Sequence, residues 1–184
     1  MCKFYSAIVT REGKLLHNKF LTSHEDLIRY FNLSEGCKGL TNDPNFIRIE
    51  FWPVNGKYCD IKNYQLDVDE SSIPSWFEQF KKPITKELTG ILKSMIRLSE
   101  NISIIAGDIV IIGQNTIVEK MVNSHIIHME NSTVNEMWGN STVNEMWGNS
   151  TVNEMRENST VNKMWGNSTV NEMWGNSKKN VKMP

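Results

Sequence analysis

The chain has little cysteine, histidine or proline: three, four and five residues respectively among 184. Cys2, Cys37 and Cys59 form no CxxC pair, so we expect free thiols in a reducing cytoplasm rather than a disulfide framework. No run of about 18 apolar residues is present and the N-terminus lacks a signal-peptide stretch, which predicts a cytoplasmic chain without a membrane helix. The formal net charge is -1 and the pI about 6.4, so direct nucleic-acid binding is not expected.

Motifs that carry catalysis are also missing. The sequence contains no Gly-rich phosphate loop, nucleophile elbow or Walker motif. The pattern gives no reason for Cys59 and His17 to approach each other, so a thiol nucleophile is not expected. His125-Ile126-Ile127-His128 has HxxH spacing, but in a β-like run residues three apart face opposite sides. We therefore expect no enzyme, no catalytic residues, no metal and no cofactor.

A nine-residue unit, Asn-Ser-Thr-Val-Asn-Glu-Met-Trp-Gly, recurs almost unchanged from Asn131 onward. A nine-residue period fits the helical turn poorly, and Gly, Asn, Ser, Thr and Val are weak helix formers. Each unit carries Val, Met and usually Trp in register, which disordered linkers rarely do. The pattern predicts a β-solenoid over residues 101–184, with its first rungs in the Ile- and Val-rich stretch 102–112.

Nine residues are too few for a coil of two strands and two turns, so we expect two units, about 18 residues, per coil. Ser132 and Val134 are expected to point inward and Thr133 outward, with Met137 filling the interior near the turn. The asparagines are expected to form amide ladders along the stack. The single Gly and missing Asp of each unit argue against a calcium-binding β-roll.

Two units per coil would bring together units that lie two apart. One edge would then run Trp138, Arg156, Trp174, with the arginine between two indoles, and the other Trp147, Trp165. Glu145 would lie beside Lys163. These five Trp and Arg residues are a candidate binding edge, and structural packing is the alternative interpretation. Lys178, Lys179 and Lys182 interrupt the repeat and predict a charged C-terminal cap.

Residues 1–100 predict a separate α+β domain in the order ββαββα. The first half comprises strands over 4–10 and 15–20 around a turn at Gly13, and a helix over 23–32 capped by Ser23. A loop containing Gly39, Asn42 and Asp43 follows.

The second half begins with a strand over 46–52 whose Arg48 and Glu50 are expected to face outward. Asn55-Gly56 is a strong hairpin-turn signal and predicts a partner strand over 58–68. A helix is expected from Ser72 onward, divided into two segments by Pro83. Asp67, Asp69 and Glu70 form a candidate acidic binding turn, with a solvated capping turn as the plainer interpretation.

Three segments carry a resemblance to small proteins of phages and prophages. They are the opening Lys3-Phe4-Tyr5-Ser6-Ala7-Ile8-Val9, the stretch Tyr64-x-Leu66-x-Val68-Asp69-Glu70 leading to Pro74-x-Trp76-Phe77, and the tandem repeats. The repeats also resemble pentapeptide-repeat proteins, although their nine-residue step departs from that family's five-residue period. The resemblance implies no catalytic residues.

The first functional hypothesis is a non-catalytic, phage-borne protein that binds and inhibits a host protein or ribonucleoprotein, such as a CRISPR-type defence nuclease. A structural module that self-associates through the repeats is the second. A small hydrolase or nuclease in residues 1–100, using the acidic turn, is the third. The identity of the target and the domain that contacts it stay open at this point.

Overall fold

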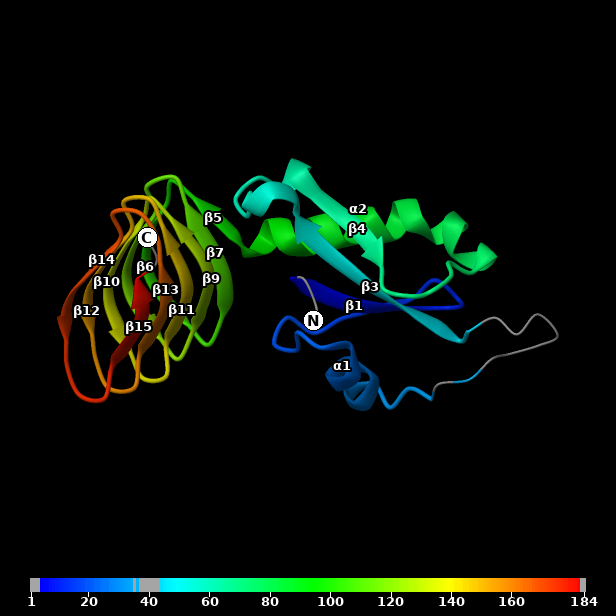
Figure 1. The fold of residues 1–184 in the computed structure, drawn as a ribbon, viewed down its shortest axis with the longest axis horizontal. Coiled ribbons are helices and arrows are strands. Elements are labelled where there is room, and N and C mark those ends of the chain that lie inside the picture. Colours follow the sequence, from blue (N-terminus) through cyan, green and yellow to red (C-terminus); the bar gives the residue numbers. More distant parts are fainter. Residues whose placement is uncertain (1–3, 35, 37–43, 183–184) are drawn as a thin grey trace. The chain divides into compact units, whose positions relative to one another are not determined.

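The computed structural model describes residues 4–34, 36 and 44–182. The chain divides into two compact units, Met1–Lys93 and Ser94–Pro184. The first combines a small antiparallel sheet with helices, and the second is a parallel β-solenoid (Figure 1). No helix in the described part of the chain has the length and apolar character needed to span a membrane.

The N-terminal sheet has four antiparallel strands in the order β2-β1-β3-β4. Its strands are β1 (Tyr5–Thr10), β2 (Leu15–Leu16), β3 (Phe46–Pro53) and β4 (Tyr64–Val68). Strand β2 is shorter than expected. The turn between β1 and β2 places Gly13 at φ +81°, as the sequence predicts for a Gly there. The expected loop at Gly39, Asn42 and Asp43 lies outside the described residues, as do Cys2 and Cys37.

The two faces of this sheet differ in chemistry. One face carries Ala7, Ile47, Ile49 and Phe51, all at most 1% exposed, and helix α2 (Glu78–Met95) lies along it (Figure 1). The other face carries Ser6, Arg48 and Glu50 beside apolar residues, under helix α1 (His24–Tyr30). Helix α1 begins as predicted, because Ser23 Oγ accepts a hydrogen bond from the Asp26 N–H at 3.1 Å.

Three local predictions for this unit are wrong. Glu50 does not face solvent: it is 4% exposed, because the sheet is covered on both faces. Asn55 and Gly56 both have positive φ, but they lie in η1 (Val54–Gly56) within a longer connection that also contains η2 (Ile61–Asn63). The partner strand therefore starts at Tyr64, opposite Pro53.

The third wrong prediction concerns Pro83, which does not divide the last helix. Helix α2 follows η3 (Ser75–Phe77) and runs without a break through Pro83 to Met95. Proline removes one helical N–H and disfavours the helical geometry of the residue before it. The burial of Ile84, Leu88 and Leu92 along one helix face outweighs this local cost.

The solenoid consists of two parallel sheets whose strands alternate along the chain (Figure 1). One sheet contains β6 (Asn101–Ala106), β8 (Ile117–Val122), β10 (Thr133–Trp138), β12 (Thr151–Met155) and β14 (Thr169–Met173). The other contains β5 (Ile96–Leu98), β7 (Ile109–Gly113), β9 (His125–Glu130), β11 (Thr142–Trp147), β13 (Thr160–Met164) and β15 (Lys178–Lys182).

Two units make one coil. Val134 pairs with Val152, and Val143 with Val161, so paired positions in the regular part lie 18 residues apart. The predicted 18-residue coil is confirmed. The solenoid starts with β5, ahead of the expected first rungs, because the chain leaves α2 directly into the first strand.

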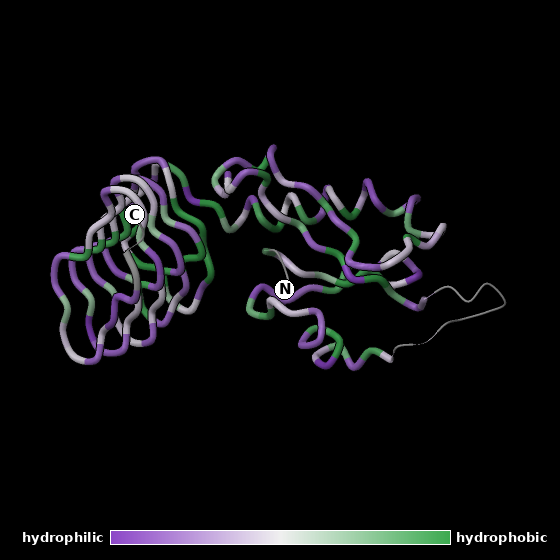
Figure 2. Tube along the Cα trace, viewed as in Figure 1, coloured by the Kyte–Doolittle hydropathy of each residue, from purple (hydrophilic) through white to green (hydrophobic). Residues whose placement is uncertain are grey.

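Each regular unit sends three side chains into the solenoid. Ser, Val and Met of the unit Ser132–Met137 are 3%, 0% and 0% exposed, and Thr133 is half-buried on the outside, as predicted. The alternation of inward and outward side chains is interrupted once in each unit: two consecutive residues, Asn135 and Glu136, separate the inward Val134 from the inward Met137. In Figure 2 the first coils are more hydrophobic than the later ones.

Glycine ends each regular unit because the turn requires positive φ. Gly139 and Gly148 have φ of +68° and +65°, and Asn123 and Asn131 approach them closely. The amide oxygens of Asn123 and Asn131 accept hydrogen bonds from the Asn140 and Asn149 N–H groups, both at 3.0 Å. Glycine therefore suits the turn at Gly139 and Gly148, whereas Glu157 holds the equivalent position with φ +58°.

Candidate functional site

The first row of side chains on the solenoid, which we call the mixed edge, contains Lys120, Trp138, Arg156 and Trp174. The guanidinium carbon of Arg156 lies 4.7 Å from the Trp138 ring centroid, and Lys120 Nζ lies 4.3 Å from it. Trp138 thus makes a cation–π contact with each of these two side chains. The predicted order of Trp138, Arg156 and Trp174 along the edge is confirmed by the pairing of β10, β12 and β14.

The second row, which we call the aromatic edge, contains His128, Trp147 and Trp165. The rings of Trp147 and Trp165 stack at 4.8 Å with an interplanar angle of 15°, as expected for units one coil apart. The His128 ring lies 6.2 Å from Trp147 on the other side. His128 is 3% exposed, and burial lowers its pKa to about 4 although Glu145 opposes the shift. It therefore contacts Trp147 as a neutral ring at pH 7, tilted by 31°.

Hydrogen bonds from the indoles hold these rings in place. Trp138 Nε1 donates to Glu136 at 2.7 Å, and Trp147 Nε1 donates to Glu145 at 3.3 Å. Trp165 follows Lys163 instead of a glutamate, and its Nε1 has no hydrogen-bond partner among the described residues. Lys163 forms an ion pair with Glu145 at 3.2 Å, as predicted. The exchange of Glu for Lys thus adds an ion pair and removes an indole acceptor.

The edges combine fixed geometry with partial exposure. Trp147 and Trp174 are 37% and 57% exposed, and the Arg156 side chain is 40% exposed while paired with Glu154. Aromatic rings and arginine in rigid positions are the groups that dominate protein-binding surfaces. The edge residues therefore pack against one another along the stack, and Trp147, Arg156 and Trp174 also keep a share of their surface in solvent.

Rows of amides stiffen the strand faces between the edges. The Asn153 side chain donates to Asn135 at 2.8 Å and Asn171 to Asn153 at 2.8 Å, while Asn162 donates to Asn144 at 3.1 Å. A second ladder at the turns joins Asn167 to Asn149 at 3.2 Å. The predicted amide ladders are confirmed, and each satisfies one amide donor with the preceding coil's oxygen.

The acidic turn does not form one site. Trp52 Nε1 donates to Asp67 at 3.2 Å, and Glu70 accepts from both the Arg48 backbone N–H and its guanidinium at 3.0 Å. Asp69 instead faces His24, with His24 Nδ1 and Asp69 Oδ2 at 3.3 Å. The three carboxylates therefore have three different partners.

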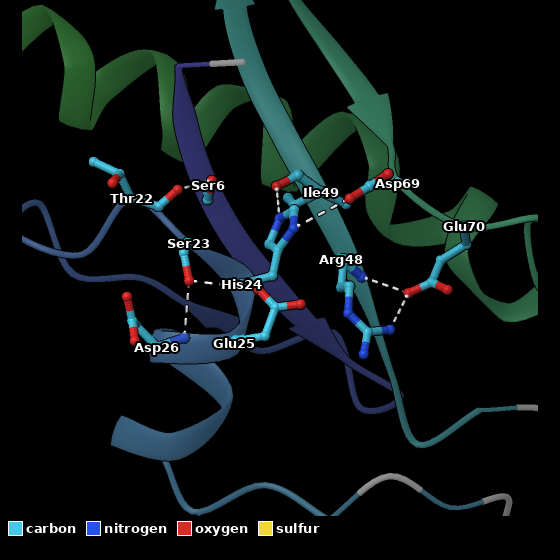
Figure 3. A network of polar contacts seen from close by, with 10 residues as sticks. All are labelled: Ser6, Thr22, Ser23, His24, Glu25, Asp26, Arg48, Ile49, Asp69 and Glu70. Atoms are coloured by element: carbon cyan, nitrogen blue, oxygen red, sulfur yellow. Dashed lines mark hydrogen bonds and ion pairs between the residues drawn. The ribbon is translucent and has the colours of Figure 1, made fainter. Parts of the chain in front are cut away.

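His24 is a functional candidate that the sequence did not single out. It opens α1, is 2% exposed, and lies between Asp69 and the carbonyl oxygen of Ile49, which its Nε2 contacts at 3.0 Å (Figure 3). Glu50 contributes a carboxylate to the same cluster. In the sequence, Glu50 in the alternating pattern of β3 points to this cluster, but alternation alone predicts a solvent-facing side chain there.

The other candidate histidines make ordinary contacts. Tyr5 Oη and His17 Nδ1 lie 2.8 Å apart. Burial raises the pKa of Tyr5 to about 12 and lowers the pKa of His17, and the tautomer of His17 decides which of the two groups donates. His125 and His128 lie on one strand at positions equivalent to Thr142 and Glu145 of the next coil. Burial also lowers the pKa of His125.

Comparisons with known proteins add no family: no family model matches the chain, and no curated protein or solved structure matches it either.

Proposed function

We propose that this chain is a non-catalytic interaction protein in which the solenoid presents the mixed and aromatic edges to a protein partner. The observation that carries the proposal is the exposure of Trp147 and Trp174, at 37% and 57%, on a backbone that is hydrogen-bonded to the preceding coil. A preorganised aromatic surface loses little conformational entropy on binding, which favours its use in recognition.

The resemblance to phage proteins extends this proposal to a partner from a bacterial host, such as a defence nuclease or another ribonucleoprotein. That extension rests on the resemblance alone. It places the chain in the host cytoplasm, where the expected partner would be.

The proposal is tested by capturing partners on immobilised wild-type chain and on the double variant Trp147→Ala/Trp174→Ala. Thr142→Ser/Thr160→Ser is a matched control, because these threonines lie on the strand face away from the edges. We expect a partner that the wild type and the threonine variant retain and the tryptophan variant loses, followed by its identification by mass spectrometry. Equal recovery with all three would contradict a role of the edges.

Self-association is a second candidate, and one observation favours it. Met173 of the last described coil is 37% exposed, whereas Met137, Met146 and Met155 at the same position are fully buried. An apolar interior left partly open at the end of a stack is a surface on which a second copy can continue the stack. Sedimentation velocity at rising concentration tests this, with Met173→Lys expected to remove any dimer.

A hydrolase or nuclease at the acidic turn has no such support. Asp67, Asp69 and Glu70 bond to Trp52, His24 and Arg48 respectively, so each carboxylate already has a partner of its own. We therefore keep the non-catalytic proposal.

A further inference from the structure

The polar cluster of the N-terminal unit joins three segments that are distant along the chain. His24 begins α1, Glu50 lies within β3, and Asp69 follows β4. Each offers one ligand atom, and these atoms lie within 4.8 Å of one another. His24 and Glu50 are 2% and 4% exposed, whereas the Asp69 side chain is 60% exposed. The cluster is therefore buried on the inside and open at one carboxylate.

The hydrogen bonds of His24 determine what faces Asp69. A backbone carbonyl oxygen can only accept, so His24 Nε2, at 3.0 Å from Ile49 O, carries a hydrogen. In a neutral imidazole the other nitrogen, Nδ1, then presents a lone pair. That lone pair lies 3.3 Å from Asp69 Oδ2, which is also an acceptor when ionised. Two acceptors at this distance require a positive species between them, either a proton or a metal ion.

A proton on Nδ1 gives one positive charge beside the carboxylates of Glu50 and Asp69, whereas a divalent cation with a neutral histidine balances both carboxylates. The Asp69 side chain is 60% exposed and water screens its charge, so the metal ion is inferred from the ligand geometry.

We propose that His24 Nδ1, Glu50 and Asp69 bind a divalent transition-metal ion of the zinc class. Metal bonds of about 2.1 Å at a tetrahedral angle place two ligand atoms about 3.4 Å apart, and His24 Nδ1 and Asp69 Oδ2 lie 3.3 Å apart. A nitrogen ligand selects zinc-like ions over magnesium and calcium, which prefer oxygen.

The surroundings match those of metal-ligating histidines. Such a histidine donates its second N–H to a carbonyl or carboxylate, which sets its tautomer, and Ile49 O has this position here. The exposed side of Asp69 leaves room for water as a fourth ligand. The ion would clip the start of α1 to β3 and to the end of β4, three segments that only the folded chain brings together.

The test uses the full chain, stripped with EDTA and dialysed. Isothermal titration with Zn²⁺ is expected to show one site per chain, and Co²⁺ is expected to give the visible absorption of a tetrahedral site with a nitrogen ligand. His24→Gln, Glu50→Gln and Asp69→Asn are each expected to abolish both signals. The loss of metal affinity should exceed the roughly 10–100-fold that is typical when a residue next to a ligand is changed. Asp67→Asn, in the same turn but bonded to Trp52, is the matched control and should bind like the wild type.

Asp69→Asn keeps the experiment decisive, because its exposed position makes a folding failure unexpected. Retention of stoichiometric Zn²⁺ binding by this variant would overturn the proposal and assign the metal to other residues. Absence of Zn²⁺ binding in the wild type would also overturn it, and ¹⁵N spectra showing protons on both ring nitrogens of His24 would then identify the proton as the bridging charge.

Discussion

The two units of this chain achieve burial in different ways. In the regular part of the solenoid, one inward set of Ser, Val and Met recurs from unit to unit, and each coil covers the next. In the N-terminal unit no position has an equivalent, and the sheet faces two chemically different environments. In the solenoid, the contribution of a side chain to the free energy of unfolding should therefore depend on the place of its coil in the stack. In the N-terminal unit it should depend on the particular neighbours of that side chain.

The largest effect should come from identical substitutions at different places in the stack. Met155→Ala removes a fully buried side chain between two coils, and we expect a loss of about 2–5 kcal/mol in the free energy of unfolding. Met173→Ala occupies the same repeat position but is 37% exposed, so its loss should be the smaller by far. Urea denaturation followed by circular dichroism measures both. Equal losses of unfolding free energy in the two variants would show that burial between neighbouring coils does not determine the contribution of the methionine.

Acid should weaken the solenoid through His128, which occupies the position of a glutamate in the regular unit. Burial lowers its pKa in the folded chain from 6.5 to about 4, so the unfolded chain binds the proton more readily. Stability is therefore fully present above pH 6.5 and is lost as the pH falls toward 4, by at most about 3 kcal/mol.

Denaturation curves between pH 7 and 4 test this prediction. The variant His128→Gln should lose less stability over this interval than the wild type, since glutamine does not titrate. If the free energy of unfolding of wild type and variant falls equally with pH, His128 is not the cause of the loss.

Glycine substitutions should separate backbone strain from crowding. Gly148→Ala places a Cβ in positive φ and against Asn131, whose Oδ1 binds the Asn149 N–H, so we expect a loss of about 2–3 kcal/mol. Gly166→Ala has the same strain, but its nearest neighbour is a carbonyl oxygen at 3.4 Å, so about 1–2 kcal/mol should be lost. Thermal unfolding of the two variants measures the difference, and a larger loss for Gly166→Ala would contradict the crowding argument.

The smallest effect is a gain. Glu157 replaces the glycine of its unit and has φ of +58°, which is strained for a residue with a Cβ. Glu157→Gly should raise the free energy of unfolding by about 1 kcal/mol. Ser99→Gly, at φ +55° outside the regular repeats, is a useful comparison. A loss of stability in Glu157→Gly would mean that the glutamate side chain contributes more than its backbone costs.

The structure of the repeats was predictable because the nine-residue period determines which residues pair between coils and which point inward. Two units per coil, the inward Val134 and Met137, the Trp147–Trp165 stack and the Glu145–Lys163 pair all follow from the nine-residue phase and the strand pairing it implies. The Lys120–Trp138–Arg156 arrangement was predicted only in part, because Lys120 belongs to a degenerate unit whose alignment the sequence leaves ambiguous.

The N-terminal unit was less predictable because its sheet is covered on both faces. Alternation in β3 correctly separates Ile47 and Ile49 from Arg48 and Glu50, but it cannot tell a polar face in solvent from one under a helix. Asn55 and Gly56 adopt the expected positive φ, yet the length of the connection depends on where β4 pairs. Pro83 is tolerated because tertiary packing outweighs local propensity.

The sequence by itself determined the solenoid, since a strict nine-residue period with one inward set allows few ways to bury that set. Only the tertiary structure decided that His24, Glu50 and Asp69 meet, because each belongs to a different element and the residues between them carry no periodic signal. Short-range patterns specify which face a residue takes. What covers that face depends on contacts between segments far apart in the chain, and these form only when the whole unit folds.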